Sequence, residues 1–235
     1  MQPSMQAPLS GNRKFIRLVT VTVAIVIACC VGSIVLYQQH QHAVRHDAAV
    51  ARGMMLKKAL ADDGNDDKLA EGARARYEAA IALASKAGGM RHDNGISGSQ
   101  SSSFQAKEAR LEQTELKRAE DASAMQMDAI DRSLQIYEDL YGAEGVQSAR
   151  ADAANFREAR NLELAEWGNA IQAIVDVYAT DNQPNSIAEQ SIADHYSKAQ
   201  ESKIHADKYE NALLTEQTRL IDRITNDLRE IIKQM

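Results

Sequence analysis

The chain has 235 residues and a formal net charge of −6, with 27 Lys and Arg against 33 Asp and Glu. It contains only 3 Pro and 12 Gly, and 5% of its residues are aromatic. A composition this poor in helix breakers and large rings is typical of slender helical bundles. The acidic balance argues against nucleic acid as a partner. The sequence lacks HExxH, GxSxG, ExxH and Gly-rich phosphate-loop motifs, so we expect no enzyme and no catalytic or cofactor-binding residues.

The first predicted element is a membrane span. Residues 1–17 form a basic leader that carries Arg13, Lys14 and Arg17. The following run, LVTVTVAIVIACCVGSIVL at 18–36, has no charged residue. At about 1.5 Å per helical residue, its length nearly matches a hydrocarbon layer of about 30 Å. We therefore expect a transmembrane helix at 18–37, embedded in the lipid bilayer, with Tyr37 as an interfacial anchor.

The charges on either side of this span predict its orientation. The first acidic residue is Asp47, and the first basic residue after the span is Arg45. Basic residues near a span stay on the cytoplasmic side. We expect an uncleaved signal-anchor in an inner or plasma membrane, crossing once, with the N-terminus cytoplasmic. The remainder would be extracytoplasmic, which in a bacterium means the periplasm or the cell surface.

Two other readings of the apolar run stay open. A cleaved signal peptide also places a basic region before an apolar stretch, although usually a shorter one. A lipoprotein would use Cys29, because Val26, Ile27 and Ala28 before it loosely resemble a lipobox. Both cysteines, Cys29 and Cys30, lie in the apolar run. Three roles are open for them: they pack against another helix, form a disulfide between two copies, or are acylated.

The next region, 38–87, is predicted to contain the juxtamembrane segment and the first bundle helix. We expect the helix to continue to about Ala61 and to be interrupted by Asp62–Asp67, with a cap at Asp66 or Asp67. A buried stripe is predicted after this interruption, widened by Ile81; its members are Leu69, Ala73, Tyr77, Ala80 and Ala84. Residues 88–103 contain almost no apolar side chain and predict a flexible loop.

The remaining bundle helices are predicted in 104–235. One block ends at Gly142 and Gly145, the next covers about 146–179, and the last begins near Ser186, where Glu189 completes a capping box. Apolar residues repeat at steps of three and four in each block: Ile130, Leu134, Tyr137 and Tyr141; Leu164, Trp167, Ile171, Ile174 and Tyr178; Ile221, Ile224, Leu228, Ile231 and Met235. We therefore expect an all-α fold, an elongated antiparallel bundle of about four helices that packs as coiled coils do. Trp167 is predicted to lie in its core.

Two weak metal patterns occur. His42 and His46 are four residues apart and share a helix face, with His40 nearby, yet two imidazoles alone make a poor site. Asp63, Asn65 and Asp67 alternate as the first ligands of an EF-hand do, but Lys68 and Arg74 stand where Gly and the bidentate acid belong. We expect no metal site, and we expect His92, His195 and His205 to be surface residues.

These features favour a membrane-anchored protein-interaction or scaffold module that binds another protein or a second copy of itself. Two alternatives remain. A small-molecule-sensing bundle would resemble the ligand domains of bacterial chemoreceptors in being helical and extracytoplasmic. An envelope tether would resemble phage inner-membrane spanins, which place a helical exterior domain after one N-terminal anchor.

Overall fold

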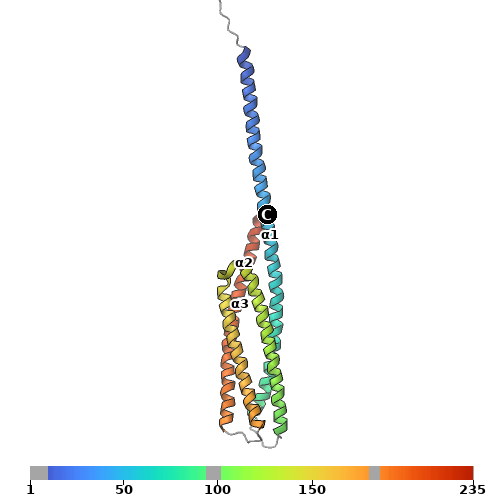
Figure 1. Cartoon of the computed structure of the whole chain (residues 1–235), viewed down its shortest axis with the longest axis vertical. Coiled ribbons are helices and arrows are strands. Elements are labelled where there is room, and N and C mark those ends of the chain that lie inside the picture. The colour runs from blue at the N-terminus through green and yellow to red at the C-terminus, as the bar shows by residue number, and fades with distance from the viewer. Residues whose placement is uncertain (1–9, 94–101, 180–185, 235) are drawn as a thin grey trace, which may run out of the picture. The chain divides into compact units, whose positions relative to one another are not determined.

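The fold consists of helices. The computed structural model describes residues 10–93, 102–179 and 186–234, and side chains at 31–34, 36–84, 110–176, 187 and 190–233. Its elements are α1 (Ser10–Asp93), α2 (Ser102–Ala179) and α3 (Ser186–Gln234), and no strand occurs in these ranges (Figure 1). The prediction of an all-α fold is confirmed. The chain divides into two units, Met1–Met54 with Glu230–Met235, and Met55–Arg229.

The number of helices differs from the prediction of about four. The two blocks expected on either side of Gly142 form one element, α2, with a reversal inside it. Gly142 has φ 76° and ψ 169°, a backbone conformation that L side chains rarely adopt. The first half of α2 (102–141) and its second half (143–179) therefore run antiparallel, as the green and yellow-to-orange ribbons of Figure 1 show. A Cβ at Gly145 would lie 2.8 Å from the Tyr141 Cβ, so the second predicted glycine allows a close approach.

The interruption predicted at Asp62–Asp67 is wrong, because α1 is helical throughout these residues. Asp63 and Asp66 lie one turn apart and are buried against α2, with 5% and 8% exposure. Arg132 Nε donates to Asp66 Oδ1 at 3.0 Å. Contacts of this kind offset the low helix propensity of Asp and Gly.

The predicted loop at 88–103 is partly wrong in its bounds. Helix α1 continues to Asp93 and α2 begins at Ser102, so both ends of the predicted loop are helical. Residues 94–101 and 180–185 lie outside the described part of the chain. The start of the last helix at Ser186 agrees with the prediction.

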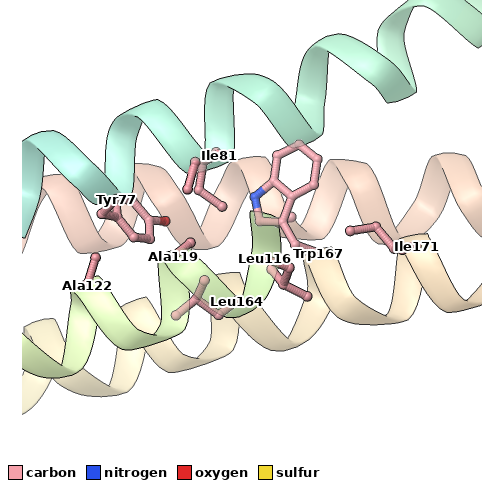
Figure 2. Packing of buried hydrophobic residues seen from close by; sticks show 10 residues of the cluster. Tyr77, Ile81, Leu116, Ala119, Ala122, Leu164, Trp167 and Ile171 are labelled. Carbon is pink, nitrogen blue, oxygen red and sulfur yellow. The ribbon is translucent and has the colours of Figure 1, made fainter. Parts of the chain in front are cut away.

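The core of the unit Met55–Arg229 joins α1, both halves of α2, and α3. Figure 2 shows Tyr77 and Ile81 of α1 with Leu116 and Ala119 of α2, and with Trp167 from the second half of α2. Trp167 is 3% exposed, which confirms its predicted burial. Its ring meets that of Tyr196 edge-on, with centroids 5.1 Å apart.

The predicted stripes are partly correct. Four of the five residues predicted on α1 are buried, whereas Leu69 is 44% exposed. In α3 the seam is different: Ile224 is buried, but Ile221 and Leu228 are only partly so. The other buried apolar residues of α3 follow a seven-residue spacing that includes small side chains: Ala199, Ala206, Leu213 and Leu220.

The other unit contains the first part of α1 and the last residues of α3. Here the Ile231 methyl lies 3.6 Å from the position of a Cβ at Gly53. No helix built by the described residues is long and apolar enough to cross a membrane. The side chains at 18–30, which make up most of the predicted span, lie outside that description, so the span at 18–37 stays a prediction.

Candidate functional site

The bundle encloses three charged side chains and one amide, which we call the charged layer: Arg160, Glu163, Glu210 and Gln126. Arg160 and Glu163 come from the second half of α2 and are 2% and 0% exposed. Arg160 Nη1 donates to Glu163 Oε2 at 2.8 Å, and its Nη2 lies 3.9 Å from Glu210 Oε2 on α3. Gln126 Nε2, from the first half of α2, donates to Glu210 Oε1 at 2.6 Å. The layer therefore ties three helical segments together at one level of the core.

Helix α1 adds two residues to this layer. The Arg160 guanidinium lies 4.0 Å from the ring centroid of Tyr77, a cation–π contact. Arg74 Nε lies 3.8 Å from Glu210 Oε1 and also donates to the exposed Glu78 at 3.0 Å, so Arg74 is shared between a buried and an exposed carboxylate. Burial acts to lower the pKa of Arg160, but Tyr77, Glu163 and Glu210 together raise it, and the guanidinium stays charged. Burial also raises the pKa of the Tyr77 hydroxyl, which stays neutral.

A pocket of about 320 Å³ lies beside this layer, between α1, the first half of α2, and α3. We call it the acidic pocket. Four carboxylates and one guanidinium line it: Asp66, Asp67, Glu71, Glu210 and Arg74. Gln126, Ser133 and apolar side chains that include Ile130 and Leu213 complete its wall. Its volume is within the range of about 300–1,000 Å³ usual for ligand sites.

A buried carboxyl group, that of Asp63, lies on α1 three residues before the first residue of this pocket. Asp63 faces Ser133 and Tyr137 of α2, which are 2% and 0% exposed. Burial raises the pKa of Asp63, although the two neighbouring hydroxyl groups act to lower it. The charged form of this carboxylate is therefore unfavourable in the folded chain.

We expect the Asp63→Asn variant to be more stable than the native chain at neutral pH. The raised pKa means that the folded chain holds this proton at higher pH than the unfolded chain, so the native free energy of unfolding falls as pH rises above about 4. Asparagine keeps an acceptor oxygen and carries no charge. Thermal melts across the pH range should show a gain that disappears in acid.

The exposed neighbour Asp62 offers the matched control. The Asp62→Asn variant should follow the native pH profile. A destabilised Asp63→Asn chain at neutral pH, or a gain that is constant with pH, would contradict the assigned burial effect.

The histidines follow the predictions in part. His40, His42 and His46 are exposed on α1, and His46 Nδ1 lies 3.7 Å from Asp47. The prediction that His195 lies on the surface is only partly correct. The side chain is half-buried, and its Nδ1 lies 2.6 Å from Glu166 Oε2. This hydrogen bond lowers the pKa of Glu166. His92 lies outside the described side chains, and His205 is exposed.

Among the described residues, no group of three or more His, Cys, Asp or Glu side chains could hold a metal ion. The EF-like residues lie on a helix, where Asp63 faces the core and Asn65 and Asp67 face solvent. A calcium loop needs ligands that converge from a turn. The predicted alternation therefore does not form a loop.

No family model, curated protein or solved structure matches this chain. The fold and the site themselves define a class: an all-α protein whose antiparallel bundle holds a charged layer with an acidic pocket beside it. The described residues thus provide a pocket that could bind a partner or ligand and a buried group of charged side chains.

Proposed function

We propose that the chain is a single-pass, membrane-anchored helical bundle that acts as an interaction module by pairing with a second copy of itself. The proposal joins the predicted anchor at 18–37 to one observation on the helix that follows it. That observation is a stripe on α1 that is exposed except at the partly buried Gln41. We call it the α1 stripe: Ile34, Tyr37, Gln41, Val44, Ala48 and Ala51.

The stripe supports pairing because its residues repeat at steps of three and four, the seam of a two-stranded coiled coil. Ile34, Tyr37 and Val44 are 57%, 64% and 53% exposed. An apolar stripe on a helix normally packs against another element of the protein or of a partner. Gln41 Nε2 donates to the Tyr37 hydroxyl at 2.7 Å. A polar residue at one seam position is a known device for fixing register.

Charge at the flanking positions favours a parallel pair. In this register Asp47 precedes the seam residue Ala48, and Arg52 follows Ala51. In a parallel coiled coil these two positions face each other across the interface, five residues apart in sequence. Asp47 of each copy would therefore face Arg52 of the second copy. A common membrane anchor also requires two copies to run parallel.

We expect the Val44→Asp variant to lose self-association, because it places a carboxylate in each half of an apolar seam. Light scattering of the full chain in mild detergent should give the mass of two copies for the native protein and one for the variant. Ala43→Asp is the matched control, since the neighbouring residue is exposed and lies off the stripe. A native chain that is monomeric at every concentration, or equal effects of both variants, would overturn the proposal.

The acidic pocket supports a second function, the binding of a small molecule. Part of its polar wall is buried, including Asp66 and Glu210, and its volume suits a ligand. The envelope-tether alternative has no contact or surface of its own among the described residues, and we do not propose it.

A further inference from the structure

A second pair of charged or titratable residues flanks the α1 stripe. His40 directly precedes the stripe residue Gln41, and Arg45 directly follows the stripe residue Val44. Both side chains are exposed. They are placed as the acid and base described above, one heptad earlier on the same helix. In the parallel pair proposed above, His40 of each copy would therefore face Arg45 of the second copy.

The two flanking pairs differ in charge. Asp47 and Arg52 have opposite charges, whereas Arg45 faces an imidazole that is either neutral or cationic. The flanking position one heptad before Arg45 holds the uncharged Gln38. Histidine is the one side chain whose ordinary gain of a proton falls between pH 5 and 8. A protonated His40 places two positive charges across the interface, and like charges in this arrangement disfavour association.

The surroundings of His40 on its own chain contain no charge that compensates this contact. The residues one turn before and after it are uncharged between pH 5 and 8: Leu36, Tyr37, Ala43 and Val44. Helix α3 comes close to α1 at Gly53, more than three helical turns farther along. The charged residues at that end of α3, Glu230 and Lys233, pair with each other. Arg45 of the second copy is therefore the charged group that His40 meets on pairing.

The other two histidines of this segment act within one copy. His42 is exposed and lies off the stripe, and His46 Nδ1 lies 3.7 Å from Asp47 on the same helix. Contacts within one helix are present in the monomer and in the dimer alike. Their protonation therefore changes the free energy of pairing less than protonation of His40 does.

We propose that protonation of His40 weakens the pairing of two copies, which makes the α1 stripe a pH-sensitive interface. This inference rests on the pairing function proposed above. The dimer holds the proton of His40 less readily than the monomer does, because Arg45 faces it only in the dimer. Pairing is therefore strongest when His40 is neutral and weakens as the pH falls through the range in which histidine is protonated.

Sedimentation equilibrium of the full chain in an uncharged detergent tests the proposal at about pH 7.5 and about pH 5.5. We expect the dissociation constant of the dimer to be about fivefold higher at the lower pH, because a symmetric dimer contains the exposed contact twice. His40→Gln should pair with the same affinity at both pH values, since glutamine does not titrate. His42→Gln is the matched control and should keep the native pH dependence.

Charge reversal at Arg45 tests the sign of the effect. In the Arg45→Glu variant the protonated imidazole faces a carboxylate, so this variant should pair more tightly at the lower pH. A native dissociation constant that is independent of pH, native pH dependence in His40→Gln, or weaker pairing of Arg45→Glu in acid would overturn the proposal. Each of these results still shows dimers and leaves the pairing function standing. A chain that is monomeric at both pH values would overturn pairing and this inference together.

Discussion

Replacing Arg160 with leucine is expected to lower the free energy of unfolding by about 3–5 kcal/mol, the usual cost of removing one partner from a buried ion pair. Arg160 is 2% exposed, and its loss leaves the carboxylate of Glu163, 0% exposed, without its cation. Glu210 would also lose a guanidinium neighbour at 3.9 Å. Urea unfolding followed by circular dichroism measures the change.

Arg157 provides the control for this variant. It lies three residues earlier on the same helix and pairs with Asp131, but the arginine side chain is 44% exposed. Surface pairs contribute about 0–1 kcal/mol, so Arg157→Leu should cost far less than Arg160→Leu. A double variant, Arg160→Leu with Glu163→Leu, should recover part of the lost stability because no unpaired carboxylate remains. Equal losses in Arg157→Leu and Arg160→Leu would contradict the charged layer.

Replacing Trp167 with alanine is expected to cost about 3–5 kcal/mol, because it opens a cavity in the core and removes the edge-on contact with Tyr196. The ring lies between α1 and both halves of α2 in Figure 2. Denaturant unfolding measures the loss of stability. It is followed by circular dichroism because this variant lacks the only tryptophan of the chain.

Trp167→Phe is the matched variant. Trp167 Nε1 has no hydrogen-bond partner among the described residues, so phenylalanine removes volume but no hydrogen bond. We expect its loss of stability to be clearly smaller than that of Trp167→Ala. An alanine variant as stable as the native chain would place the ring outside the core.

The sequence pattern predicted the second half of α2 well. Leu164, Trp167, Ile171 and Ile174 repeat at steps of three and four, and all four are buried. The reversal at Gly142 was also predictable, since glycine is the residue that adopts positive φ readily. These features depend on local spacing and backbone sterics, which a single sequence carries.

The interruption at Asp62–Asp67 failed for a reason outside local sequence. Asp and Gly disfavour helix, but Asp66 gains Arg132 of α2 as a partner, and that contact exists only after the helices pack. The seam of α3 was not predicted because alanines such as Ala199 and Ala206 contribute little to a hydrophobic pattern. The larger side chain of Ile221 instead indicated a neighbouring face of the helix as the buried one.

The charged layer could not be located from the sequence. Glu163 and Glu210 look like many other surface acids, and Gln126 has no distinguishing motif. One signal was present: Glu210 falls between Ala206 and Leu213, within the seven-residue seam of α3. A charged residue at a seam position indicates a buried partner, but its identity requires the packed bundle.

The proposed pairing through the α1 stripe is tested most directly by disulfide scanning. Single cysteines would be placed at 41, 44, 48 and 51 on the stripe, and at 43, 46 and 50 off it, in full chains whose Cys29 and Cys30 are serine. In membranes under mild oxidation, we predict that the stripe positions form covalent dimers and the others do not. Equal cross-linking at all seven positions, or none at the stripe, would contradict a parallel pair formed through this face.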